Sequence, residues 1–146
     1  MSVMTAERRA EIKNSFAKQG LMDTFKAELE KIEHGHIEIS MPYSDAVSQQ
    51  HKFFHGGVIG ALSDSACGYA AISVLGEDEA ALTAEYKINL LSVANGERII
   101  AVGKVLKPGR TLVVCHGDVF VEKSGKQKLC ATMLMTMCVV KNLEHK

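Results

Sequence analysis

A histidine and two glycines stand immediately before a long apolar segment that contains a single carboxylate. They are His55, Gly56 and Gly57, and the carboxylate is Asp64, eight residues after the first glycine. Glycines at a helix start leave backbone N–H groups free, and these groups suit an anion or a developing oxyanion. A carboxylate among apolar residues is costly to desolvate unless its charge is paired or used. The residue types suit an oxyanion site near the glycines and a catalytic role for Asp64, although two glycines before a helix are also common where no such site exists. The alternative for Asp64 is a hydrogen bond to a neighbouring serine or exposure to solvent.

A buried helix must position these groups. The apolar run continues to Leu75, which is long enough for about five helical turns. Small and apolar residues occur on every side of it, which is typical of a helix that its neighbours approach closely from all directions. We expect Gly76 to end this helix.

Strands are predicted on both sides of the helix. After it, β-rich segments cover residues 81–93, 98–106, 111–121 and 128–140. The turns between them predict a four-stranded antiparallel meander, because Asn-Gly and Pro-Gly are hairpin signals. These turns are Asn95-Gly96, Pro108-Gly109 and Ser124-Gly125. Before the helix, residues 24–33 combine a helix-like composition with alternating polarity, and residues 36–41 alternate clearly. We expect a strand in each segment, joined by a turn at His34 and Gly35.

An amphipathic helix is predicted over residues 5–20, with Thr5 as its cap and Gly20 as its stop. Ile12 and Phe16 are four residues apart and share the face that would pack on the rest of the protein. The expected fold class is therefore α+β, with a long antiparallel sheet wrapped around one buried central helix and an N-terminal helical arm over residues 1–20. Free edges of such a sheet are often paired with another subunit.

Length and composition exclude several classes of protein. With 146 residues, we expect a single domain over residues 1–146. Lys plus Arg and Asp plus Glu both number 17, so the chain lacks the basic excess of a nucleic-acid binder, and its zero net charge permits oligomers. No apolar run approaches the roughly 20 residues that span a bilayer, so we expect no membrane partner. The four cysteines lie in apolar runs without a CxxC pair, which indicates reduced core residues of a cytoplasmic protein. They are Cys67, Cys115, Cys130 and Cys138.

The pattern of His55, Gly56, Gly57, six further residues and Asp64 resembles the hotdog-fold acyl-CoA thioesterases of the phenylacetate-degradation (PaaI-like) type. The similarity continues through the helix sequence HGGVIGALSDSACGYAA, the strand sequence TAEYKINLL and the turn KPGRT. It covers residues 16–140. The resemblance implies a hotdog fold and hydrolysis of an aryl- or fatty-acyl-CoA thioester to the free acid and coenzyme A.

The resemblance also implies roles for individual residues. The amide of the first glycine, Gly56, would polarise the thioester carbonyl, and Asp64 would be the nucleophile or general base. A side-chain amide seven residues before that glycine, Gln49, would help to bind the thioester or orient the catalytic group. A hydroxyl on the next strand, Thr83, would position the water. The thioester would pass near His55, whose imidazole is expected to support the loop rather than transfer protons.

Helix geometry indicates that one subunit cannot complete the site. Gly56 and Asp64 are eight residues apart on one helix, which separates them by about 12 Å along the axis. Reacting groups must approach to roughly 3–3.5 Å. Two antiparallel helices across a two-fold axis would bring Gly56 of one subunit to Asp64 and Thr83 of the other. We therefore expect a homodimer with shared active sites, and the family implies that dimers often pair into tetramers.

Coenzyme A carries phosphates, so cations should line its entrance. The candidates are Lys107 and Arg110 around the Pro108-Gly109 turn, although each is equally explained as a solvated surface cation. Lys87, Lys104 and Lys123 are further possibilities. We assign Gly57 and Phe54 to substrate contact. Other residues that could line an apolar acyl pocket are Phe53 and Tyr69, whereas Met133, Met135 and Met137 alternate along one strand and indicate core.

Other chemistries fit the sequence less well. Cys115 and His116 are neighbours on a predicted strand, so their side chains point to opposite faces. No Gly-x-Ser-x-Gly elbow is present. His51 and His55 lack a third ligand nearby, so we expect no metal, and no cofactor apart from the coenzyme A of the substrate.

Two rival functions remain open on the same predicted fold. One is a non-catalytic acyl-CoA-binding or sensing protein, against which the presence of Asp64, Gln49 and Thr83 together argues. The other is a hydratase or dehydratase, because fold does not decide function. That chemistry normally places His and Asp or Glu at other spacings.

Overall fold

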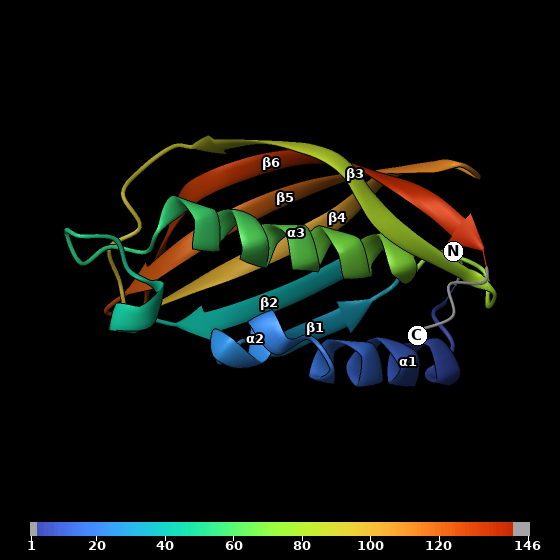
Figure 1. Cartoon of the computed structure of the whole chain (residues 1–146), viewed down its shortest axis with the longest axis horizontal. Helices are drawn as coiled ribbons and strands as arrows, with labels where there is room; N and C mark the ends of the chain where they lie inside the picture. Colours follow the sequence, from blue (N-terminus) through green and yellow to red (C-terminus); the bar gives the residue numbers. More distant parts are fainter. Residues whose placement is uncertain (1–2, 142–146) are drawn as a thin grey trace.

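One antiparallel sheet of six strands bends around a single long helix, α3 (Figure 1). The computed structural model describes residues 3–141. The helices are α1 (Ala6–Ala17), α2 (Gly20–Thr24) and α3 (Gly56–Ile72), with a 3-10 turn at Asp45–Val47. The strands are β1 (Glu28–Glu33), β2 (His36–Pro42), β3 (Glu79–Leu90), β4 (Arg98–Pro108), β5 (Leu112–Lys123) and β6 (Lys126–Lys141). The sheet order is β1-β2-β4-β5-β6-β3, so β1 and β3 are its edges. The predicted sheet wrapped around one helix is confirmed.

The central helix begins where the sequence predicts and ends earlier. His55 is its N-cap, and nine of its residues are buried. The predicted stop at Gly76 is wrong by about one turn. The hydroxyl of Ser73 donates to the carbonyl of Ala70 at 2.7 Å and accepts the N–H of Gly35 at 2.7 Å, which fixes the end of the helix at that point.

Two glycines of the sheet let α3 approach closely. A Cβ on Gly103 of β4 would overlap the backbone of Ala66, and a Cβ on Gly117 of β5 would lie 2.5 Å from Oγ of Ser63. The helix backbone therefore rests directly on the middle of the sheet. This contact fixes the height at which α3 holds Asp64 above the strands.

The predicted four-stranded meander is wrong in one connection. The hairpins β4-β5 and β5-β6 are present, but β3 pairs with β6 and β4 pairs with β2. The Asn95-Gly96 segment is therefore a crossover between distant positions of the sheet and not a hairpin turn. A Cβ on Gly96 would overlap the carbonyl group of Glu122. This glycine therefore allows the chain to pass close to β5.

The N-terminal arm is confirmed, with Thr5 as the cap that accepts the N–H of Arg8. Gly20 does not end this helix, since α1 ends at Ala17 and Gly20 begins α2. Side chains hold α1 in place. The guanidinium of Arg8 donates to the carbonyl groups of Leu75 and Gly76, and Ile12 is 1% exposed.

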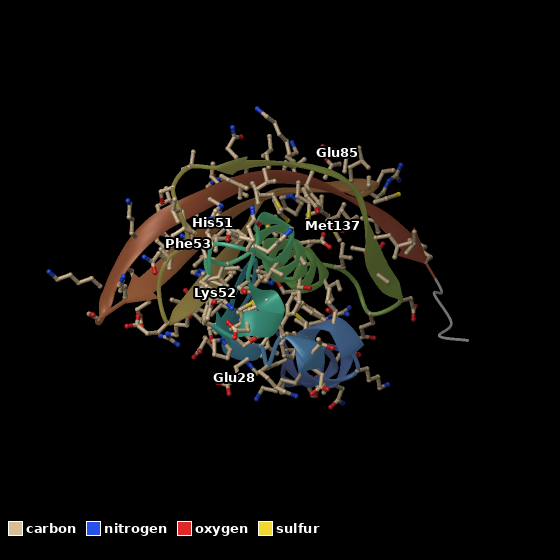
Figure 2. All side chains as sticks on the ribbon, turned by 60° about the vertical axis from the view of Figure 1, so that its left-hand side comes forward. Glu28, His51, Lys52, Phe53, Glu85 and Met137 are labelled. Carbon is tan, nitrogen blue, oxygen red and sulfur yellow. The ribbon has the colours of Figure 1, made fainter. Side chains whose placement is uncertain are left out.

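The two faces of the sheet differ in character. Figure 2 shows the sheet as an arch over α3, with Met137 on its inner side and Glu85 on its outer side. Cys67, Cys115 and Cys130 are free and buried, and Cys138 is half-buried, as the sequence predicts for a reduced core. Met133, Met135 and Met137 are also buried. These methionines therefore lie on the inner face of β6, which is turned toward the helix.

Candidate active site

Asp64 and Thr83 form the centre of the candidate site. Asp64 lies in the middle of α3 and is half-buried, and Thr83 lies on edge strand β3. The Thr83 hydroxyl donates a hydrogen bond of 2.8 Å to Oδ1 of Asp64 and lies 3.4 Å from the sulfur of Met137. The register of β3 against β6 shifts between Thr83 and Glu85, and such bulges re-aim side chains. The hydroxyl thus fixes one carboxylate oxygen and leaves the other free to act.

The start of α3 offers one free backbone donor, where the sequence predicts two. The N–H of Gly57 donates to Nδ1 of His55 at 2.9 Å, so this amide is already used. The N–H of Gly56 has no acceptor within residues 3–141. His55 therefore caps the helix, and Gly56 remains as the donor that an oxyanion could use.

Gly56, Gly60 and Asp64 follow one another at intervals of four and share one face of α3. This face looks toward β3. A Cβ on Gly56 would lie 2.8 Å from Cδ1 of Leu90, and a Cβ on Gly60 would lie 3.6 Å from the hydroxyl of Tyr86. Gly56, with its free amide, and the carboxylate of Asp64 thus lie on the same side of one helix, about 12 Å apart along its axis.

Gln49 lies in the loop before α3. Its side-chain oxygen accepts the N–H of His51, and its main chain bonds Phe53 and Lys52. The structure brings together Asp64 and Thr83 within the chain, but it holds Gln49 through its own loop rather than against Asp64. Its role at the thioester therefore stays a prediction.

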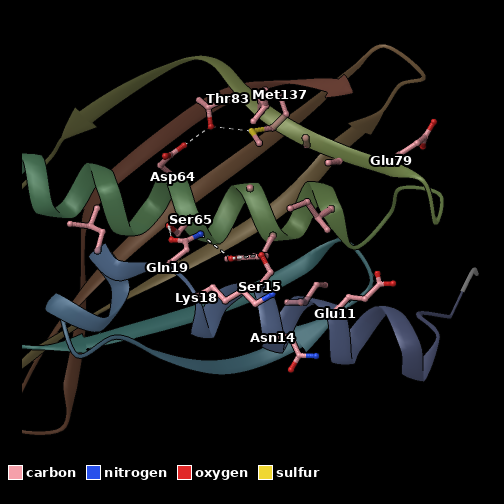
Figure 3. A pocket seen from close by; sticks show the side chains of 18 of the residues that line it. Glu11, Asn14, Ser15, Lys18, Gln19, Asp64, Ser65, Glu79, Thr83 and Met137 are labelled. Carbon is pink, nitrogen blue, oxygen red and sulfur yellow. Dashed lines mark hydrogen bonds between the residues drawn. The ribbon is translucent and has the colours of Figure 1, made fainter. Parts of the chain in front are cut away.

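A groove of about 810 Å³ runs along α3 between α1 and β3. Figure 3 shows Asp64, Thr83 and Met137 on one side of it and Ser15 and Gln19 on the other. The β3 side is mainly apolar, with Ala81 and Leu82, whereas α1 contributes mainly polar side chains. A molecule that bound at Asp64 could therefore extend along α3, with a mainly apolar wall on one side and a mainly polar wall on the other.

The remaining predicted binding residues lie in two places. Phe54 is 3% exposed and packs edge-on to Tyr43 at a centroid distance of 5.4 Å, so within one chain it belongs to the core. Lys107 and Arg110 are exposed at the β4-β5 turn. In the sheet, Val113 pairs with Met137 and Met137 pairs with Thr83, so this turn lies at the same end of the sheet as Thr83.

Desolvation keeps the buried thiols neutral. It raises the pKa of Cys115 to about 12 and that of Cys130 to about 11. It also raises the pKa of Cys67, with a smaller contribution from the neighbouring Cys115. Cys115 points into the core while the ring of His116 bonds Thr132 at 2.9 Å, so the two do not form a catalytic pair. These three thiols are therefore poor nucleophiles at neutral pH.

A polar cluster on the groove wall was not predicted from the sequence. Gln19 donates to the hydroxyl of Tyr69 at 2.9 Å and accepts from Ser65 at 3.2 Å, and Ser15 shares a 3.1 Å bond with Tyr69. The sequence places Ser15 and Gln19 four residues apart, which could have indicated a polar face. Their contact with α3 depends on how the arm folds back, which no local pattern reveals.

Residues 3–141 contain neither a metal-binding cluster nor a membrane-spanning helix. No cluster of three or more His, Cys, Asp or Glu side chains there is arranged to hold a metal ion. No helix in the same range is long and apolar enough to cross a membrane.

Comparison with known proteins identifies the family. Residues 51–128 match the family model of the thioesterase superfamily. A thioesterase family protein from Silicibacter pomeroyi is 40% identical, with a TM-score of 0.90 over 92% of this chain and 98% of that one. The PaaI protein of the Escherichia coli phenylacetic acid degradation operon shares the fold at 16% identity, with a TM-score of 0.85 over 95% and 97% of the two chains. A curated relative from Saccharolobus solfataricus is 30% identical over 95 residues, which are 65% of this chain and 66% of that protein.

Proposed function

Because this chain belongs to the thioesterase superfamily, with the hotdog fold that the sequence predicts, we propose that it hydrolyses an acyl-CoA thioester. The family is one of thioester hydrolases, so the general class of reaction follows from membership. The observation that carries the specific proposal is the 2.8 Å hydrogen bond between Thr83 and Asp64 on the wall of the groove. The bond orients the carboxylate of Asp64 at a place that a thioester can reach.

The active site is shared between two subunits. The Gly56 amide and the Asp64 carboxylate lie on one face of α3, about 12 Å apart along the axis, which is too far for one thioester carbonyl to contact both. An antiparallel partner helix supplies the missing group at each end. Gly56 of one subunit then serves the same thioester as Asp64 and Thr83 of the other.

Edge strand β3 is the surface on which the partner binds. The other edge, β1, is short and carries four charged residues, which protect an edge from pairing. Strand β3 has twelve residues, and Leu82, Tyr86 and Leu90 on it are 53%, 43% and 56% exposed. Pairing of β3 with its copy covers these side chains and sets the two copies of α3 side by side. Dimers pair further into a dimer of dimers.

Hydrolysis needs one water and no cofactor. In the first route, Asp64 removes a proton from water while the oxygen attacks the carbonyl carbon, and the Gly56 amide of the partner stabilises the oxyanion. The carbon–sulfur bond then breaks, coenzyme A leaves as a thiolate, and the proton on Asp64 returns to it. In the second route, Asp64 attacks the carbonyl carbon directly and expels coenzyme A as a thiolate, which leaves a mixed anhydride. Water then cleaves this anhydride to the free acid and the Asp64 carboxylate, and its remaining proton goes to the thiolate. Lys107 and Arg110 hold the phosphates of coenzyme A.

Thiol release from a panel of aryl- and straight-chain acyl-CoAs tests the proposal. We expect turnover by the wild-type protein and a loss of at least about a thousandfold in Asp64→Asn, which keeps the size of the side chain and removes its basicity. Asp118→Asn, on the outer face of β5, is the matched control and should keep full activity. Wild-type binding of acyl-CoA without turnover would instead indicate a non-catalytic binding protein.

A further inference from the structure

We propose that the groove along α3 receives the acyl group of the substrate, and that Gln19 and Tyr69 on its wall select acyl groups that carry a hydrogen-bonding oxygen. The inference rests on the proposed function, because it assumes that the thioester lies at Asp64. It adds a substrate class and assigns specificity to residues outside the catalytic group.

The position of the groove fits an acyl group that extends away from Asp64. Asp64 and Thr83 line the same groove of about 810 Å³ as Gln19 and Tyr69. Tyr69 follows Asp64 by five residues on α3, which places it about 7.5 Å further along the helix axis and about 140° around it. An aryl or medium-length acyl group covers that distance. The cluster also extends toward Asp64, since Gln19 accepts a 3.2 Å hydrogen bond from Ser65, the next residue on α3. The far end of such an acyl group therefore meets Gln19 and Tyr69.

The cluster retains donors that no described residue uses. Gln19 employs one of its two side-chain N–H groups for Tyr69 and one oxygen lone pair for Ser65. Ser15 and Tyr69 share a single 3.1 Å bond, although their hydroxyls hold two protons. One N–H and one O–H therefore have no acceptor within residues 3–141. Both suit an oxygen on the bound acyl group.

The remainder of the groove matches an acyl group with an apolar body and a polar end. Ala61, Gly68, Ala81 and Leu82 give α3 and β3 a mainly apolar surface. Helix α1 presents Glu11 and Asn14 to the same space, and Lys18 follows directly after the helix. A plain alkyl chain would desolvate these groups without replacing their bonds to water, which is unfavourable.

Tyr69 is held rigidly enough to discriminate between substrates. Its side chain is 3% exposed, and the ring of Phe16 packs against it at a centroid distance of 6.0 Å. Gln19 is the residue before α2 and makes no side-chain cap bond there, so its side chain is available to the groove. Tyr69→Phe keeps the packing of the ring and removes only the hydroxyl, and Gln19→Leu keeps the size of the side chain, so both variants test the hydrogen bonds themselves.

The test compares two pairs of substrates that differ in one hydroxyl group: benzoyl-CoA with 4-hydroxybenzoyl-CoA, and hexanoyl-CoA with 6-hydroxyhexanoyl-CoA. For each pair the ratio of kcat/KM, hydroxylated over plain, is measured in the wild type, Gln19→Leu and Tyr69→Phe. Gln127→Leu is the matched control, because it makes the same substitution at an exposed position at the start of β6, outside the groove. The same ratios are measured as Kd by calorimetry in Asp64→Asn, so that the result does not depend on turnover.

We expect a wild-type ratio of about tenfold for at least one pair, the size of effect that one hydrogen bond gives. The ratio should fall to about twofold or less in Gln19→Leu and Tyr69→Phe and stay unchanged in Gln127→Leu. A wild-type ratio near one for both pairs would overturn the inference, as would a preference that both variants retain. Absence of all turnover would contradict the proposed function instead, and the Kd ratios would still decide the role of the groove.

Discussion

The hydroxyl of Thr83 donates a 2.8 Å hydrogen bond to Oδ1 of Asp64, from the edge strand β3 to the middle of the central helix. The two residues are 19 positions apart in the sequence, and the sheet order places β3 beside β6 rather than beside β4. The bond joins a catalytic candidate to the edge strand on which we propose that a partner subunit binds. In the proposed dimer, pairing of the subunits and orientation of the carboxylate would therefore depend on the same strand.

Thr83→Val should lower kcat by about ten- to a hundredfold, because it keeps the shape of the side chain and removes a hydrogen bond to a charged group. The free energy of unfolding should change little. Thr136→Val is the matched control, since Thr136 makes a 2.6 Å bond to Glu85 on the outer face. Equal losses of kcat in the two variants would show that the Thr83 hydroxyl has no special role.

Gly56→Pro should lower kcat by about a hundredfold or more, the usual effect of losing one oxyanion donor. Proline removes the N–H, and the first position of a helix tolerates it well. His55 already has the extended conformation, with ψ of 137°, that a residue before proline favours. Gly56→Ala keeps the N–H and adds a Cβ whose close neighbour is the flexible end of the Leu90 side chain, so it should retain most of the activity. Full activity of Gly56→Pro would exclude this amide as the donor.

Gly103→Ala should lower the free energy of unfolding by roughly 1–3 kcal/mol, because the new Cβ overlaps the backbone of Ala66 and forces α3 away from the sheet. Urea unfolding measures the change. Gly20→Ala is the control, since no atom lies within 4 Å of a Cβ there. Equal stability of the two variants would contradict the close contact between helix and sheet.

The free energy of unfolding should decrease as pH rises above about 9. Burial raises the pKa of Cys115 from 9.0 to about 12, so between these values the folded state holds a proton that the unfolded state has lost. The difference lowers stability by up to about 1.4 kcal/mol per pH unit for each such thiol. Cys115→Val removes one titrating group, so its stability should decrease less steeply with pH. Identical slopes in the two proteins would show that this thiol does not contribute.

Local patterns predicted the elements well and their partners less well. The composition of residues 56–75 suffices to predict the buried helix. The glycine-containing dipeptides after it suffice to predict where most strands begin and end. The position of β3 beside β6 depends on which strand covers the far side of α3, and Asn95-Gly96 has the same composition whether it forms a hairpin or a crossover. The helix ended early because of Ser73 and Gly35, which are 38 residues apart.

Part of the candidate site could likewise be predicted from the sequence, and part of it could not. Asp64 and Gly56 stand out because their residue types are unusual in an apolar helix, and Thr83 follows from the resemblance. The loss of the Gly57 amide to His55 depends on a side-chain rotamer, and the cluster of Gln19 and Tyr69 depends on how the arm packs. Neither leaves a signal in the order of the residues.

Mixing of two inactive variants tests the shared site most directly. Asp64→Asn and Gly56→Pro are unfolded together, refolded as a mixture and assayed for thiol release, with each variant treated alone as control. If each site takes Gly56 from one subunit and Asp64 from the other, half of the dimers are mixed and each has one intact site, which restores about a quarter of wild-type turnover. Activity of the mixture no higher than that of the separate variants would contradict a site shared between subunits.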